Sequence, residues 1–203
     1  MDKPVFEKSI SVCFSGHRKI PSDRTDNLCE KLDAAIEQLI KNGKSVFMAG
    51  GAIGFDTIAA FRVLAAKEKY PDIKLVLVLP CRDQTDRWTS LKSLNEYKIL
   101  KDNADKVLYM KDFYDVTCMK ERNKYMVDNS SCCVAYLTSA SGGTAGTVKY
   151  AEKCGVPVIN LKKLPLLQSS LRKLSTETMP RLISPQKSLC LSAPTPHLPT
   201  SFV

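Results

Sequence analysis

The chain has 203 residues, 44% of them hydrophobic and 25% charged, and a formal net charge of +9. This length is sufficient for one domain with a full hydrophobic core, and the composition lacks the charge excess of a disordered chain. No stretch approaches the roughly 20 apolar residues that span a bilayer, and residues 1–8 lack the apolar core of a signal peptide. The sequence therefore predicts a cytoplasmic globular protein without a membrane segment.

The positive charge is concentrated at the carboxyl end of the chain. Residues 162–203 carry six basic residues and one acidic residue, which is +5 of the total +9. The same stretch holds six of the eleven prolines and seven serines. We predict one domain over residues 1–161 and a basic, Pro/Ser-rich, disordered tail over 162–203. Because the predicted domain is only mildly basic, nucleic acid is the less favoured partner.

Short apolar runs alternate along the chain with stretches of helical periodicity. In chain order, the predicted elements are strand 10–14, helix 28–40, strand 45–49, helix 59–66, strand 73–79, helix 88–100, strand 106–110, helix 119–127, strand 131–137, helix 144–153 and strand 156–161. Asn42-Gly43 is a typical helix end, and Pro80 is expected to close the third strand. The strands are continuously apolar, as in sheets buried on both faces. The pattern predicts a single α/β domain of Rossmann-like, doubly wound architecture, with a mainly parallel sheet and helices on both faces.

Eight cysteines are present, but their placement does not favour disulfides. Cys13, Cys132 and Cys133 lie within predicted buried strands. No CxxC pair occurs, and with only two histidines a zinc site is poorly supplied. We predict free thiols and no metal site.

Three predicted strands end in glycine-containing loops. The loops are Ser15-Gly16-His17-Arg18, Gly50-Gly51-Ala52-Ile53-Gly54-Phe55-Asp56 and Ser141-Gly142-Gly143-Thr144-Ala145-Gly146-Thr147. Ligands of open α/β sheets bind at the carboxyl ends of strands, where glycine admits an anion close to backbone N–H groups and a helix N-terminus adds a favourable dipole. The predicted ligand-binding residues are Ser15, Gly16, Arg18, Gly50, Gly51, Gly54, Asp56, Arg122, Gly142, Gly143, Thr144 and Thr147.

Several of these residues allow a second interpretation. Asp56 is either a ribose ligand or a helix cap. Arg122 either donates to a phosphate or lies on a solvated helix face, and Trp88 either stacks on a base or covers the edge of the domain. No Walker A motif follows a strand, and no GxGxxG opens the first helix, which argues against an ordinary dinucleotide dehydrogenase.

The loops, together with the segments 82–88, 122–128 and 142–151, resemble the SLOG superfamily, which groups the DNA-processing protein DprA with the LOG phosphoribohydrolases. The resemblance covers residues 10–161 and is greatest to the YpsA-like branch. It implies a Rossmann-like fold and the binding of nucleotides or nucleotide-derived ligands.

The chain departs from the LOG enzymes at the loop that serves their catalysis. Those enzymes carry Pro-Gly-Gly-x-Gly-Thr-x-x-Glu, whereas here Ser141 replaces the proline, Ala145 is an extra residue and Tyr150 stands in place of the glutamate. Asp56 and Asp128 remain as candidate catalytic carboxylates outside that motif.

We therefore predict a sensing or regulatory domain that binds a small AMP- or ADP-ribose-like molecule. Beyond this nucleotide-type ligand, the sequence indicates no cofactor with certainty. One alternative is a LOG-like nucleotide N-glycosidase, and another is a DprA-like single-stranded DNA binder. Self-association into a homo-oligomer is left open.

Overall fold

The computed structural model describes residues 6–164, so the predicted tail lies outside the described residues except for 162–164. The described elements, in chain order, are η1 (Lys8–Ile10), β1 (Ser11–Gly16), α1 (Ser22–Lys41), β2 (Val46–Ala49), α2 (Phe55–Lys67), β3 (Lys74–Cys81), α3 (Leu91–Asn103), β4 (Lys106–Lys111), α4 (Cys118–Asp128), β5 (Cys132–Tyr136), α5 (Gly143–Lys153) and β6 (Val158–Asn160). The predicted alternation of strands and helices is confirmed.

The six strands form one sheet in the order β4-β3-β2-β1-β5-β6, and every neighbouring pair is parallel. The chain builds outward from β1 to β4 and then returns to place β5 on the other side of β1. Cys13 on β1 is therefore aligned with Met48 on β2 and with Cys133 on β5. The predicted doubly wound parallel sheet is confirmed, and its strand order reverses between β1 and β5.

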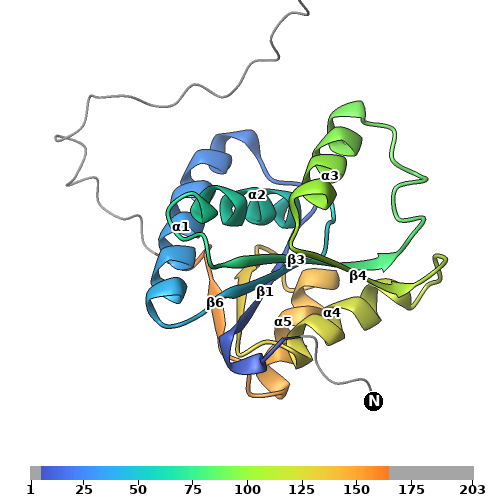
Figure 1. The fold of residues 1–203 in the computed structure, drawn as a ribbon. Helices are drawn as coiled ribbons and strands as arrows, with labels where there is room; N and C mark the ends of the chain where they lie inside the picture. Colours follow the sequence, from blue (N-terminus) through green and yellow to red (C-terminus); the bar gives the residue numbers. More distant parts are fainter. Residues whose placement is uncertain (1–5, 165–203) are drawn as a thin grey trace, which may run out of the picture. The chain divides into compact units, whose positions relative to one another are not determined.

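Helices cover both faces of the sheet (Figure 1), and a separate hydrophobic cluster packs on each face. One contains residues of α1, α2 and α3 and centres on stacked rings, with Phe14 and Phe47 6.1 Å apart. The other contains Met126 and Val127 of α4 and Val148 of α5. Because both faces are covered, the strands between them are apolar along their whole length, which explains the continuous runs in the sequence.

The third strand continues past its predicted end at Pro80. Leu79 and Cys81 are aligned with residues of β4, whereas pairing with β2 ends at Leu77. Successive residues of a strand direct their backbone groups to opposite sides, so the missing N–H of Pro80 falls on the side that β2 no longer occupies. Proline therefore removes no sheet hydrogen bond at this position.

The cysteines follow the prediction within residues 6–164, where all seven are free. Five of them are buried: Cys13, Cys81, Cys118, Cys132 and Cys133. In this described part of the chain, none of the helices has the length and apolarity that a membrane crossing requires.

Candidate functional site

A crevice of about 310 Å³ lies beyond the carboxyl end of β1, where the strand order reverses. We call it the switch-point crevice. It is lined by Phe14, Ser15, Gly16, His17, Arg18, Ala52, Asp56, Met119, Arg122, Asn123, Gly143 and Thr144. Open parallel sheets bind their ligands at this position. The connections that follow the two neighbouring strands run to opposite faces of the sheet, and a gap remains between their loops.

The third glycine loop presents an open helix N-terminus to this crevice. Gly142 precedes α5 with a φ of +92°, a left-handed conformation that glycine adopts without strain. The first-turn N–H groups of Gly143, Thr144 and Ala145 lack partners within the helix, as at any helix start, and no residue of the described chain accepts from them. Gly143 and Thr144 line the crevice, so these donors and the positive end of the helix dipole are suited to an anion.

The second glycine loop is directed into the protein instead. The N–H of Phe55, at the start of α2, donates to the carbonyl of His17 over 3.1 Å. Gly54 approaches the first loop so closely that a Cβ atom there would lie 2.2 Å from the carbonyl oxygen of Arg18. The N-terminus of α2 therefore supports the first loop. Gly54 of the second loop allows the two backbones to approach each other closely.

A buried ion pair lies at the base of the crevice. Arg122 Nη1 on α4 is 3.1 Å from Asp56 Oδ2 on α2, and the side chains are only 6% and 8% exposed. Gly50 makes room for this pair, since a Cβ atom at that position would lie 0.9 Å from Arg122 Nη1. Of the two interpretations left open for Arg122, the solvated helix face is wrong.

Burial raises the pKa of Asp56 above its ordinary value. The charge of Arg122 and its hydrogen bond act in the opposite direction, as do hydrogen bonds from the backbone of Ala52 and Gly50. Arg122 Nε is buried without a hydrogen-bond partner in the described chain. The guanidinium is thus held by Asp56 through Nη1 and contacts Met119 Sδ through Nη2 over 3.9 Å.

The first loop supplies both a cation and a connection across the switch point. The Arg18 side chain lines the crevice and makes no ion pair or hydrogen bond within residues 6–164. The neighbouring His17 accepts a hydrogen bond at Nε2 from the N–H of Thr138, over 3.0 Å. This bond joins the loop after β1 to the loop after β5, so the two walls of the crevice are fixed relative to each other.

Two other candidate residues do not line the crevice and have structural partners instead. The Thr147 hydroxyl donates to the carbonyl of Gly143 and accepts from Asn123, each over 2.9 Å, which connects α5 to α4. Asp128 is the last residue of α4 and accepts a hydrogen bond from the Tyr150 hydroxyl over 2.9 Å. Because α4 begins at the carboxyl edge of the sheet and runs back along it, Asp128 lies at the edge opposite the crevice.

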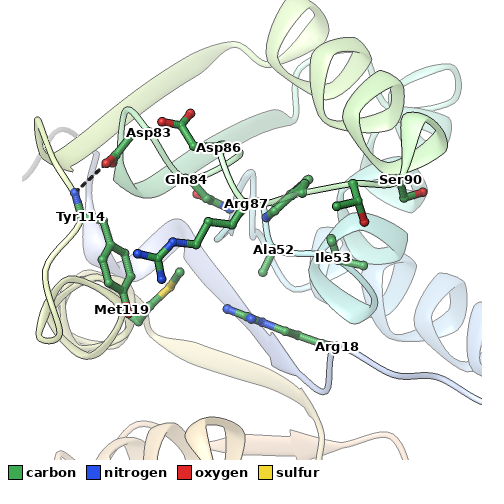
Figure 2. Close-up of a pocket in the computed structure, with 12 residues that line it drawn as sticks. Arg18, Ala52, Ile53, Asp83, Gln84, Asp86, Arg87, Ser90, Tyr114 and Met119 are labelled. Carbon is green, nitrogen blue, oxygen red and sulfur yellow. Dashed lines mark hydrogen bonds between the residues drawn. The ribbon is translucent and has the colours of Figure 1, made fainter.

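A second, larger pocket of about 560 Å³ shares Arg18, Ala52 and Met119 with the switch-point crevice (Figure 2). We call it the outer pocket. Its other lining residues come from the β3–α3 connection, the β4–α4 loop and the second glycine loop: Ile53, Asp83, Gln84, Asp86, Arg87, Trp88, Thr89, Ser90 and Tyr114. Trp88 both lines this pocket and packs edge-on against Tyr97, with ring centroids 5.4 Å apart.

The predicted site residues thus divide into two groups. Those that line the switch-point crevice are Ser15, Gly16, Arg18, Asp56, Arg122, Gly143 and Thr144. Those that shape its surroundings are Gly50, Gly51, Gly54, Gly142 and Thr147.

Sequence reasoning missed Met119 and Asn123, which face the crevice from α4 one helical turn apart and on the same side as Arg122. Met119 is three residues before Arg122 and Asn123 is four residues after Met119, a spacing that places residues on one helix face. This spacing could have identified them from the sequence.

Comparison with known proteins identifies relatives over most of the described domain. The family model of YpsA, described as the YspA SLOG family, matches residues 19–155. The uncharacterized SPbeta prophage-derived protein YoqJ of Bacillus subtilis (strain 168) is 34% identical over 139 residues, which are 62% of this chain and 81% of that protein. A UPF0398 protein of Bacillus pumilus (strain SAFR-032) is 23% identical over 124 residues, 60% of this chain and 67% of that protein.

Two solved structures of DNA processing protein A (DprA) are similar in fold. The protein from Helicobacter pylori, whose single-stranded DNA binding mode has been described, has a TM-score of 0.54 at 20% identity and is matched over 63% of its chain. The protein from Streptococcus pneumoniae has a TM-score of 0.55 at 15% identity and is matched over 50% of its chain. These matches cover 73% and 74% of the present chain, which spans only part of either DprA. The family model covers well over half of the sequence, and the chain belongs to the YspA SLOG family.

Proposed function

We propose that the switch-point crevice binds a nucleotide or a nucleotide-derived molecule, AMP- or ADP-ribose-like, and that the domain senses this ligand. The observation that carries the proposal is the convergence of Arg18 and the open N-terminus of α5 on one crevice at the reversal of strand order. A guanidinium without a protein partner and a row of free backbone N–H groups together match the charge and geometry of a phosphate.

The crevice also offers hydroxyl groups to the rest of such a ligand. Ser15 and Thr144 line it, and their side chains make no hydrogen bond to other residues within 6–164. We assign the phosphate to the first turn of α5 and to Arg18, and the ribose to the polar side chains around Ser15 and Asn123. Asp56 then acts through Arg122, which it orients, because its own oxygen is already engaged.

Binding is better supported than hydrolysis of an N-glycosidic bond. Hydrolysis needs a carboxylate that activates water or stabilises an oxocarbenium-like transition state. Asp56 is the one carboxylate among the crevice-lining residues of the described chain, and it is buried against Arg122. Tyr150, at the position of the LOG glutamate, bonds to Asp128 instead.

Single-stranded DNA binding is the second candidate, and a specific surface favours it. The β4–α4 loop exposes Phe113 and Val116, which are 79% and 90% accessible, close in sequence to Lys120 and Lys124 on α4. Val116 lines one pocket together with Lys120 and Lys124. Surfaces that hold single strands combine exposed rings, such as that of Phe113, with cations. The described DNA binding of the Helicobacter pylori protein adds to this candidate through likeness of fold alone.

The cytoplasm is the location that we propose for this activity. The seven described cysteines are free thiols, and one of them, Cys154, is exposed. Free thiols persist in reducing compartments such as the cytoplasm.

Calorimetric titration of AMP into the full chain tests the proposal. We expect saturable binding that Arg18→Ala weakens about ten- to a hundredfold, since a charge-assisted contact is lost. Lys19→Ala is the matched control, because Lys19 is an adjacent exposed cation that does not line the crevice. Binding of a short single strand, but not of AMP or ADP-ribose, would favour the second candidate and contradict the first.

A further inference from the structure

The outer pocket holds two arginines that form no ion pair within the described residues. Arg18 and Arg87 both line it, and neither forms an ion pair or a side-chain hydrogen bond with any residue in the range 6–164. Figure 2 shows the two guanidinium groups reaching into the same space from different elements, Arg18 from the first glycine loop and Arg87 from the β3–α3 connection. Two guanidinium groups that are directed into one pocket and form no ion pair with a carboxylate favour an anion between them.

The carboxylates of the pocket form no ion pair with these arginines, although the pKa of Asp83 is lowered, first by the hydrogen bond from the Tyr114 backbone and in smaller part by the charge of Arg87. Asp83 Oδ2 accepts from the backbone N–H of Tyr114 over 3.1 Å, and its other oxygen is buried. Figure 2 shows Asp86 directed away from both guanidinium groups. The guanidinium groups of Arg18 and Arg87 therefore remain available to an added anion, although the lining as a whole includes both signs of charge.

The walls of the outer pocket are fixed before any ligand arrives. The Asp83 contact holds the β4–α4 loop, and the Arg87 guanidinium lies 5.5 Å from the ring centroid of Tyr114. Gln84 Nε2 donates to the carbonyl of Gly51 over 2.8 Å, which ties the β3–α3 connection to the second glycine loop. Because these walls are pre-organised, an anion binds with less loss of conformational entropy.

We infer that the outer pocket binds a second phosphate of the ligand, held between Arg18 and Arg87. This inference rests on the proposed function, because it places the first phosphate at α5 in the switch-point crevice. Arg18 lines both cavities, so one bound diphosphate can extend from the switch-point crevice into the outer pocket along the Arg18 side chain. The site therefore selects nucleoside diphosphates and their derivatives over nucleoside monophosphates.

The test is the ratio of the dissociation constants of AMP and ADP, measured by calorimetry on the full chain without divalent cations. In the unmodified protein we expect ADP to bind at least about tenfold more tightly than AMP, as one added charge-assisted contact provides. Arg87→Ala should bring this ratio to about one and leave AMP affinity unchanged. Arg87→Gln, which keeps most of the side-chain volume, should do the same if the alanine variant proves unstable.

Arg82→Ala is the matched control. Arg82 lies in the same connection but bonds to Asp112 over 2.9 Å, stacks on Tyr109 and lines neither cavity. This variant should keep the preference for ADP. Equal affinity for AMP and ADP in the unmodified protein, or a preference that survives both Arg87 substitutions, would overturn the inference and leave the crevice proposal intact. Failure of both nucleotides to bind would overturn the proposed function and this inference together.

Discussion

Arg122 Nη1 lies 3.1 Å from Asp56 Oδ2, and this contact joins α4 to the start of α2 beneath the switch-point crevice. The two residues are 66 positions apart in the sequence, and each comes from a helix on a different face of the sheet. The pair therefore fixes the relative position of the two helical layers at the edge where we propose that the ligand binds.

Removing one member of this pair should destabilise the fold strongly. Arg122→Met leaves the Asp56 carboxylate buried without its counter-ion, and the expected loss is about 3–5 kcal/mol in the free energy of unfolding. The double variant Asp56→Ala, Arg122→Met should lose less than the sum of the two single variants, because it leaves no unpaired charge. Urea denaturation of the four proteins measures this coupling. Additive losses would show that the two residues act independently.

The cost of losing Arg122 should also depend on pH. Burial already raises the pKa of Asp56 above its ordinary value of 3.8, and Arg122 opposes the rise, so Arg122→Met should raise the pKa further. A carboxyl with a raised pKa in the folded state contributes stability below its unfolded pKa and loses that contribution as pH rises through its folded pKa. The loss of unfolding free energy that Arg122→Met causes, relative to the unmodified protein, should therefore be small near pH 4 and grow towards about pH 7. If this loss were constant over the same pH range, Asp56 would not be the buried carboxyl whose pKa Arg122 lowers.

Gly50 should be intolerant of any side chain. Gly50→Ala places a Cβ atom where Arg122 Nη1 lies, so we expect a loss of about 1–3 kcal/mol in the free energy of unfolding. Gly146→Ala is the control, because a Cβ atom there meets nothing within 4 Å and the position is inside α5. Since alanine favours a helix over glycine, this control should gain about 0.5–1 kcal/mol. Thermal denaturation of both variants measures these changes in stability. Equal changes for Gly50→Ala and Gly146→Ala would argue against the close approach of Arg122 to Gly50.

The uncharged imidazole of His17 should carry its proton on Nδ1 rather than on Nε2. Its Nε2 accepts the Thr138 N–H, and a protonated Nε2 would place two donors against each other. Nitrogen-detected NMR of the imidazole ring near neutral pH reports this tautomer directly. His17→Ala should loosen the connection between the loops after β1 and β5 and weaken AMP binding. A proton on Nε2 at neutral pH would mean that the two loops are not joined in this way.

The sequence predicted the layers of the fold well because burial on both faces leaves a local signal. Continuous apolar runs marked each strand, and the helical spacing from Leu28 to Ile40 marked the buried face of α1, although not its polar first turn from Ser22. The glycine loops were also visible, because their position after strands has a known consequence for ligand binding.

What the sequence did not reveal was the different use of the three loops. Whether a helix N-terminus faces solvent or donates to another loop, as Phe55 does to His17, depends on contacts between segments distant in sequence. The partner of Arg122 was hidden for the same reason, because no local pattern relates it to Asp56 or Gly50. The outer pocket combines three connections, so only the folded chain brings Arg18 and Arg87 together.

A crystal structure of the full chain with bound AMP tests the central claim most directly. We predict density for the nucleotide in the switch-point crevice, with phosphate oxygens about 3 Å from the backbone nitrogens of Gly143 and Thr144 and from the guanidinium of Arg18. AMP bound elsewhere, such as beside Arg24, Lys31 and Lys162 in the cavity at the start of α1, would contradict the account. So would AMP in the crevice with its phosphate directed away from α5.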